Sequence, residues 1–233
     1  MPSRRPWVFR QVWHDLAFLH WPVGASALRP LLPSSLIVEE HSGSAWVSIT
    51  PFWLSGLGIR LLPGAPLLPR FEELNARTYV SLDGRPGVWF FSLDASNALF
   101  VQAGRRLYDL PYALARMSHH RHGEELTYRS ERVADGVTFA ASYRPTGPVE
   151  RSRPGTLPHW LTERYCLYAP TRSGGLKRAE IHHEPWPLQP ASVEIERNDL
   201  LQSLGIEVEG PPPQVHFSKR LDVVVWLPER VGG

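Results

Sequence analysis

A few ionisable residues of this chain could transfer a proton or hold an anion. Glu73 is the acidic candidate, because burial in an apolar cavity would raise its pKa and make it a usable general acid or base. The alternative is a carboxylate that is exposed or paired with Arg70 or Arg77. His14 could exchange a proton near neutral pH. His20 would lie on the same side of a continuous strand, where we expect a hydrogen-bonded core histidine.

Four residues are candidates for binding a substrate: Arg77, Arg164, His182 and His183. A buried arginine can hold a carboxylate bidentately, although Arg164 could equally pair with a neighbouring strand and have no other role. His182 and His183 are adjacent, so a strand would point them to opposite faces and only one could line a cavity. Cys166 lies among Tyr and Leu residues, which indicates a small buried hydrophobe rather than a nucleophile.

The sequence gives no positive sign of a metal site or a cofactor. Its ten histidines and single cysteine lack the spacing of a zinc site. It contains no glycine loop of the phosphate-binding type and no Gly-x-Ser-x-Gly nucleophile elbow. We therefore expect no metal, no cofactor and no serine-hydrolase chemistry.

The elements that must position these residues are mostly short strands. The 23 prolines and 18 glycines disfavour long helices, and β-rich runs between turn residues favour an antiparallel sheet or barrel. The spacing predicts one hairpin from strands 77–82 and 87–93, joined at Asp83-Gly84, and a second from strands 126–130 and 137–143. Further strands are expected over residues 45–50, 160–168, 177–182, 192–195 and 215–226.

Three short helices are expected between these strands. Two of them would begin at caps, with Asp94 or Ser96 capping the first and Asp109 capping the second. Residues 198–205 have the pattern of a short helix that a glycine ends. The apolar, proline-rich segment 61–69 is either the lid or rim of a site or a rigid connector.

Length and composition indicate a single domain over residues 1–233. Hydrophobic residues make up 42% of the chain and charged residues 21%, which is ordinary for a globular protein. Nine Trp, nine Phe and seven Tyr residues suit a thick core or an apolar cavity. The net charge of +2 is too small, and the arginines are too dispersed, to indicate a nucleic-acid partner.

The cysteine content and the length of the apolar runs indicate which cellular compartment to expect. A single cysteine cannot form an internal disulfide and fits a reducing compartment. Residues 1–12 lack the apolar stretch of a signal peptide, and no apolar run is long enough to span a bilayer. We expect a cytoplasmic protein with no membrane partner, and the sequence leaves homo-oligomer formation open.

Motifs along nearly the whole chain carry a family resemblance. They are Trp13-His14-Asp15, Leu19-His20-Trp21-Pro22-Val23, Leu28-Arg29-Pro30-Leu31-Leu32-Pro33, Leu74-Asn75-Ala76-Arg77-Thr78-Tyr79-Val80, Pro86-Gly87-Val88-Trp89-Phe90-Phe91-Ser92-Leu93-Asp94-Ala95, Leu110-Pro111-Tyr112, Tyr143-Arg144-Pro145-Thr146-Gly147, Leu161-Thr162-Glu163-Arg164-Tyr165-Cys166-Leu167-Tyr168, Glu180-Ile181-His182-His183 and Arg220-Leu221-Asp222-Val223-Val224-Val225-Trp226. These motifs resemble those of the uncharacterised YqjF-like family, DUF2071. The chain is therefore identified as a member of that family.

That family is similar, at the level of a superfamily, to acetoacetate decarboxylases. The resemblance implies a closed, decorated β-barrel with a ligand cavity inside it. It places Glu73, or its neighbour Glu72, where those enzymes have a cavity carboxylate, and His14 roughly where they have an arginine. Tyr112 and Ala113 stand at the positions of their paired lysines, one of which forms a Schiff base with the substrate. Imine formation needs an amine, so it is not expected at this position.

We therefore expect a mainly β (α+β) fold, a closed, decorated antiparallel β-barrel of the acetoacetate decarboxylase-like type with a few short helices. Its cavity is expected to bind a small, largely apolar organic molecule. In an enzyme, Glu73 would carry a proton in lyase- or isomerase-type chemistry on a carbonyl compound, with Tyr112 and His14 orienting or polarising the oxygen. The alternatives are a non-catalytic carrier, sensor or sequestering protein, and an imine enzyme whose amine has moved to Lys219.

Overall fold

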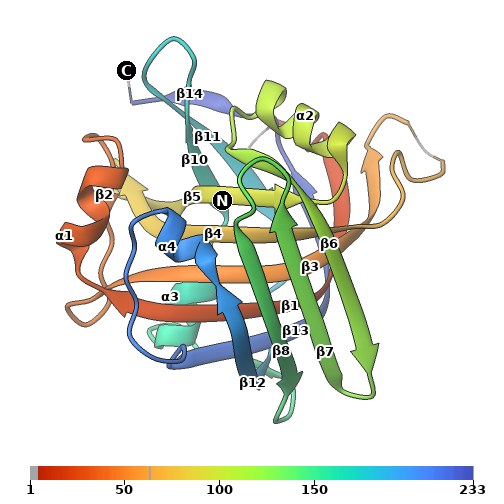
Figure 1. The fold of residues 1–233 in the computed structure, drawn as a ribbon. Helices are drawn as coiled ribbons and strands as arrows, with labels where there is room; N and C mark the ends of the chain where they lie inside the picture. The colour runs from red at the N-terminus through yellow and green to blue at the C-terminus, as the bar shows by residue number, and fades with distance from the viewer. Residues whose placement is uncertain (1–4, 63, 233) are drawn as a thin grey trace.

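The computed structural model describes residues 5–62 and 64–232, whose strands, up to 15 residues long, build one large, mixed β-sheet (Figure 1). The strands are β1 (Phe9–Val23), β2 (Ile37–Val38), β3 (Ala45–Ile59), β4 (Phe71–Leu82), β5 (Arg85–Ala95), β6 (Tyr112–His122), β7 (Glu125–Arg132), β8 (Thr138–Pro145), β9 (Glu150–Arg151), β10 (Cys166–Pro170), β11 (Leu176–His182), β12 (Pro187–Asn198), β13 (Gln214–Val225) and β14 (Glu229–Val231). The helices are α1 (Ala25–Leu28), a 3-10 turn (Arg29–Leu31), α2 (Ala98–Leu107), α3 (Leu157–Thr162) and α4 (Asp199–Ser203).

The sheet closes on itself. Neighbouring strands follow the order β14-β11-β10-β5-β6-β7-β8-β12-β13-β1-β3-β4-β2, and the further pairings β4–β5 and β11–β13 join distant parts of this path. Strands β13, β1, β3, β4 and β5 therefore form a shared wall between two rings. Strands β10 and β11 complete one ring, and the outer layer of β6, β7, β8 and β12 completes the other.

The expected mainly β fold with a few short helices is confirmed, with one change in strand direction. The sheet is mixed rather than wholly antiparallel, because β5 pairs in parallel with both β6 and β10. Both parallel neighbours follow a connection that contains a helix, as parallel pairing requires a longer crossover than a hairpin.

The shared wall is buried on both faces. In β1, Leu16 and Phe18 belong to the core inside the ring completed by β10 and β11, whereas Ala17 and Leu19 belong to the core under the outer layer. Strand side chains alternate between faces, so one strand can supply two cores. In β1, residues 16–19 accordingly form a continuous apolar run where both faces are covered.

Both predicted hairpins are present, as β4–β5 and β7–β8, and the short helix expected late in the chain is α4. The helix expected after β5 is α2, but its cap differs from the prediction. The Asn97 side chain accepts hydrogen bonds from the backbone N–H groups of Leu99 and Phe100 at 3.0 and 3.1 Å. Asn97 therefore caps α2, rather than Asp94 or Ser96.

Two other local predictions are wrong. No helix begins at Asp109, which has a φ of 49° and pairs with Lys177 at 2.6 Å, so the chain enters β6 directly at Tyr112. Residues 157–162 form α3 instead of the start of a strand, because a proline in the first turn favours a helix there. Strand β10 begins only at Cys166.

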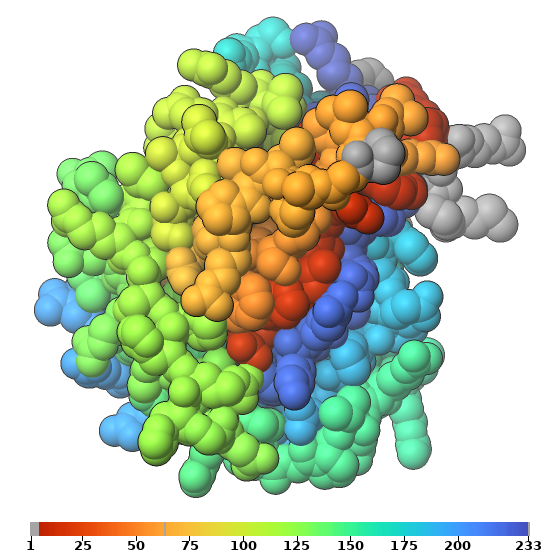
Figure 2. Space-filling model, turned by 90° about the vertical axis from the view of Figure 1, so that its right-hand side faces the viewer, coloured from red at the N-terminus to blue at the C-terminus, as the bar shows by residue number. Residues whose placement is uncertain are grey.

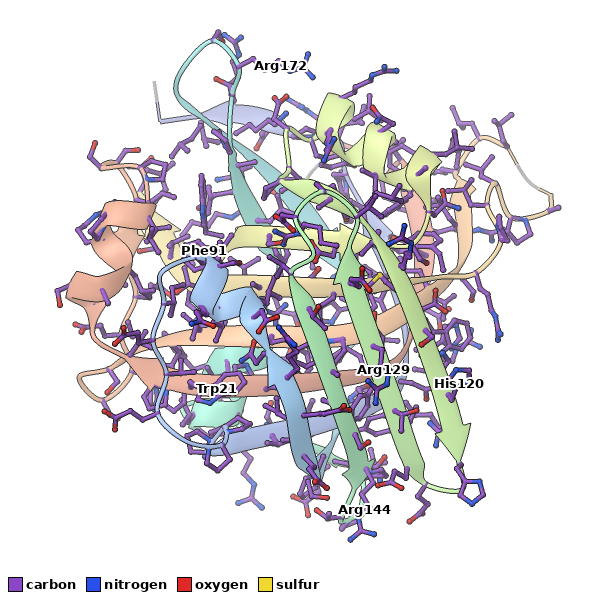
Figure 3. All side chains as sticks on the ribbon, viewed as in Figure 1. Trp21, Phe91, His120, Arg129, Arg144 and Arg172 are labelled. Atoms are coloured by element: carbon purple, nitrogen blue, oxygen red, sulfur yellow. The ribbon has the colours of Figure 1, made fainter. Side chains whose placement is uncertain are left out.

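Basic side chains are distributed over the surface of the molecule. Figure 3 shows His120, Arg129 and Arg144 on the outer layer, and Arg172 at the turn between β10 and β11. All four are exposed or partly exposed. Among the described residues, no helix has the length and apolar character needed to cross a membrane.

Candidate functional site

A cavity of about 340 Å³ lies inside the ring that the shared wall forms with β10 and β11. Its walls come from these strands, with α2 and the start of β6 also contributing. This volume is typical of a small-molecule site. Most of the lining is aliphatic or aromatic, and includes Phe9, Trp13, Leu16, Phe52, Val88, Phe90, Leu93, Phe100, Leu167, Ile181, Trp186 and Val225.

The segment between β3 and β4 borders the cavity. Leu67 and Leu68 of this segment line it together with Leu99 and Phe100 of α2. Figure 2 shows this segment, in yellow-orange, beside the yellow-green α2 on one face of the molecule. Within segment 61–69, residues 67 and 68 thus lie at the rim of the cavity, while Pro63 lies outside the described residues.

Glu73 is buried in the cavity wall, with 4% of its surface exposed. Regular alternation along β4 places Glu73, Asn75 and Arg77 on the cavity face. Loss of solvation raises the pKa of Glu73 to about 8, and hydrogen bonds from Tyr112 and Asn75 offset only part of this effect. The carboxyl group is therefore mostly protonated at neutral pH, with a pKa suited to proton transfer.

Tyr112 lies beside Glu73, and its hydroxyl donates a hydrogen bond to Oε2 of Glu73 at 3.3 Å. The backbone carbonyl of Tyr112 accepts a hydrogen bond from Nε of Arg105 at 2.6 Å. Gly104 of α2 makes room for the Tyr112 ring, because a Cβ at position 104 would clash with ring carbons. Burial and the nearby Glu73 carboxyl raise the pKa of Tyr112 well above its ordinary value, so the phenol remains neutral.

Arg77 and Arg164 also line the cavity, with only 9% and 7% of their surfaces exposed. The Arg77 guanidinium lies 5.1 Å from the centre of the Phe18 ring. Arg164 forms an ion pair with Glu39. By contrast, none of the carboxylates in residues 5–62 and 64–232 pairs with Arg77.

Of the two adjacent histidines, only His183 lines the cavity, as expected for neighbours on a strand. His183 is buried, and its Nδ1 donates a hydrogen bond to the backbone carbonyl of Glu184 at 2.8 Å. Burial lowers the pKa of His183, so the ring is neutral and its Nε2 is an acceptor. His182 is exposed at the end of β11, outside the cavity, so we correct its assignment to substrate binding.

His14 also lies outside the cavity, contrary to expectation. Its ring stacks on Trp53 with 3.8 Å between ring centres, and its Nε2 lies 2.8 Å from the hydroxyl of Ser55. It borders a separate hollow of about 400 Å³ together with Lys219 and Arg220. Burial lowers the pKa of His14, with the Arg220 charge as a smaller cause. A catalytic role for His14 beside Glu73 is therefore withdrawn.

A backbone irregularity at Asp15 explains this position. Asp15 has a φ of 50°, and the register of β1 with β3 shifts in the same segment. Trp13 lines the cavity before the irregularity and Leu16 lines it afterwards, so His14 points to the opposite face. His20 is a fully buried, hydrogen-bonded core histidine as expected, but it does not share a face with His14.

The chain has two lysines, and neither lines the cavity. Lys177 is 8% exposed and pairs with Asp109. Lys219 is exposed beside the second hollow. Among the described residues that line the cavity, none carries an amine that could form an imine.

Several polar cavity residues were missed from the sequence, including Thr50, Asn75 and Trp186. Asn75 could have been found, because it lies two residues from both Glu73 and Arg77 on the same strand. Trp186 follows the end of β11 in an irregular segment, which gave no such signal. Within the described part of the chain, no three His, Cys, Asp or Glu side chains are grouped closely enough to hold a metal ion.

Sequence comparison assigns the chain to a family. The DUF2071 model, described as an uncharacterized conserved protein, matches residues 10–222. The uncharacterized protein YqjF of Bacillus subtilis (strain 168) is 42% identical over 221 residues, which cover 94% of this chain and 91% of that protein. The chain belongs to the DUF2071 family. The family that the sequence motifs indicated is thereby confirmed.

Solved structures show what fold this DUF2071 member has. Acetoacetate decarboxylase from Legionella pneumophila matches with a TM-score of 0.69 at 14% identity, covering 100% of this chain and 92% of that one. The enduracididine biosynthesis enzyme MppR, solved with pyruvate, matches with a TM-score of 0.67 at 10% identity, covering 99% and 93%. An acetoacetate decarboxylase-like enzyme from Sphingomonas wittichii RW1 matches with 0.65 at 13% identity, covering 99% and 96%. At these identities the likeness shows the acetoacetate decarboxylase-like fold alone.

Proposed function

We propose that this protein binds a small, largely apolar organic molecule in the cavity and transfers a proton to or from a carbonyl compound held there. The observation that supports this most is the pairing of a buried carboxyl group, Glu73, with the Tyr112 hydroxyl at 3.3 Å in a largely apolar wall. The pKa of Glu73, about 8, suits a group that alternates between acid and base near neutral pH.

The geometry supports a specific division of roles. In its ionised form, Glu73 would remove a proton from the carbon next to a carbonyl group, while the Tyr112 hydroxyl donates a hydrogen bond to the carbonyl oxygen. The protonated Glu73 would then return the same proton to a carbon of the enolate, or to its oxygen to give the enol. This is lyase- or isomerase-type chemistry, and it needs no amine.

The fold relatives are consistent with carbonyl chemistry but differ in the reacting group. One of them is named as an acetoacetate decarboxylase, and MppR was solved with pyruvate, so carbonyl compounds occupy this fold elsewhere. Here the absence of both lysines from the cavity argues against an imine. His14 is left out of the proposed machinery because it lies on another face.

The test measures the exchange of hydrogen for deuterium at the carbon next to the carbonyl group. Apolar ketones and aldehydes, 2-octanone among them, are incubated with the protein in D₂O, and NMR follows deuterium entering the position next to the carbonyl. We expect Glu73→Gln to slow exchange by roughly a hundredfold or more, the usual range for a lost general acid–base. Glu124→Gln, which changes an exposed glutamate in the β6–β7 turn, should leave the rate unchanged.

The second candidate is a carrier, sensor or sequestering protein that binds without catalysis. The predominance of aliphatic and aromatic side chains in the wall favours it. Binding of these compounds without any protein-dependent exchange would support this candidate and refute the proposed chemistry. Exchange that persists in Glu73→Gln would refute the role given to Glu73.

A further inference from the structure

Buried polar atoms that lack a hydrogen-bond partner gather on the wall of the cavity. In a folded protein nearly all buried polar atoms are paired, so a group of unpaired ones in one place indicates a missing partner. Each atom of this group belongs to a residue that lines the cavity and lacks a partner among the described residues. They are Trp13 Nε1, Asn75 Oδ1, Arg77 Nε, Arg164 Nη2, His183 Nε2 and Trp186 Nε1.

Arg77 stands out in this group because its charge is not compensated. Arg164 has the Glu39 carboxylate beside it, whereas Arg77 pairs with no carboxylate in the described chain. Glu73, the acidic residue of the cavity wall, is protonated at neutral pH. The cavity therefore carries one net positive charge in a largely apolar enclosure, an arrangement that is unfavourable until an anion enters.

The unpaired atoms near this charge are mostly donors. The guanidinium of Arg77 and the indole of Trp186 each present an N–H group that lacks an acceptor, and Arg164 presents another at Nη2. A charge interaction with Arg77 contributes to the lowered pKa of His183, which places that ring in the same part of the cavity. Buried charged donors that line a cavity are a usual binding site for a carboxylate.

The register of β4 separates this positive end from the Glu73 end. Glu73 and Arg77 lie on the same face of one strand, four residues apart, so their Cα atoms are about 13 Å apart at the usual rise per residue. The side chains of Phe52, Leu16 and Leu93 line the same cavity. A ligand that reaches both ends must therefore be elongated and apolar along its length.

We propose that the cavity binds a monocarboxylate with an extended apolar body, its carboxylate on Arg77 and its far end beside Glu73 and Tyr112. This inference rests on the proposed function, because it specifies the ligand of the same cavity. In such a substrate, the apolar body lies between the carboxylate and the reacting carbonyl group and separates them by its length. Short oxoacids such as pyruvate or acetoacetate cannot span the two ends.

Calorimetry with matched ligands tests the inference. Octanoate, octanamide and pyruvate are titrated into the wild-type protein at neutral pH. We expect octanoate to bind at least tenfold more tightly than octanamide, which has the same length but no charge, and pyruvate to bind weakly. Arg77→Met should abolish the preference for octanoate over octanamide, while Arg129→Met, at an exposed outer-layer position, should retain it.

A stability measurement separates a binding role from a structural one. Arg77→Met removes a buried charge that has no carboxylate partner, so without ligand its melting temperature should not fall below that of wild type. Octanoate should raise the melting temperature of wild type and not that of Arg77→Met. Arg77→Lys keeps the charge, and is expected to keep the preference for octanoate with reduced affinity.

The outcomes distinguish the two proposals. Equal affinity of wild type for octanoate and octanamide would overturn the carboxylate assignment and leave cavity binding intact. Failure of both ligands to bind would overturn cavity binding as well. Loss of affinity for both ligands together in Arg77→Met and Arg77→Lys would show that Arg77 supports the fold, and would also overturn the assignment.

Discussion

The buried, protonated state of Glu73 predicts that this one side chain makes the protein less stable as pH rises. In the unfolded chain the carboxyl group titrates near 4.5, and in the folded protein its pKa is about 8. Between these values the unfolded state releases a proton that the folded state keeps, so stability falls as pH increases through this window. Below pH 4.5 both states are protonated and the effect vanishes.

The magnitude follows from the two pKa values. Between pH 5 and pH 8 the unfolded carboxyl is almost fully ionised and the folded one reaches half-ionisation, so the loss is about 3 to 4 kcal/mol. Glu73→Gln keeps a similar shape and cannot ionise. The free energy of unfolding of Glu73→Gln minus that of wild type should therefore be about 3 to 4 kcal/mol larger at pH 8 than at pH 5.

The assay is urea denaturation of both proteins at several pH values, with Glu124→Gln as an exposed control. For a chain of this length, this change corresponds to a change of about 7 to 14 °C in the difference between the melting temperatures of wild type and Glu73→Gln. The difference between wild type and Glu124→Gln should not vary comparably. Parallel pH profiles for wild type and Glu73→Gln would refute a raised pKa of Glu73 and with it the proposed proton transfer.

Three further outcomes are expected. Tyr112→Phe removes a hydrogen bond that lowers the pKa of Glu73, so the fall of stability with pH should extend to higher pH. If the same urea series shows the fall of stability over an unchanged pH range, the Tyr112–Glu73 hydrogen bond is contradicted. Gly104→Ala places a Cβ against the Tyr112 ring and should destabilise the protein by about 1 to 3 kcal/mol in urea denaturation, whereas Gln102→Ala on the exposed face of α2 should be nearly neutral. Borohydride reduction with acetoacetate should give no adduct by mass spectrometry, and a stable adduct on either lysine would contradict the absence of an accessible imine-forming amine.

Much of the strand framework could be predicted because its signals are local. Asp83-Gly84 specifies the turn between β4 and β5, and the strands predicted on either side of it, 77–82 and 87–93, lie within β4 and β5. The burial of Glu73 in an apolar cavity also followed once the family resemblance was recognised. These features depend on neighbours in sequence or on a motif.

Other parts of the site depend on contacts that the sequence does not display. At Asp15, a single residue with positive φ, the alternation of side chains between the two faces of β1 is interrupted. His14 therefore points away from the cavity. Asp109 pairs with Lys177, which is distant in sequence, and so does not cap a helix. That Arg77 has no carboxylate partner among the described residues can be recognised only when every surrounding carboxylate has been placed.

The most direct test of a cavity with a carboxylate-binding end and a proton-transferring end is a crystal structure of the wild-type protein with octanoate. We expect the ligand inside the cavity, with carboxylate oxygens within hydrogen-bond distance of Arg77 and the alkyl end beside Glu73 and Tyr112. Octanoate bound only in the hollow next to His14, or with its carboxylate beside Glu73, would contradict this arrangement.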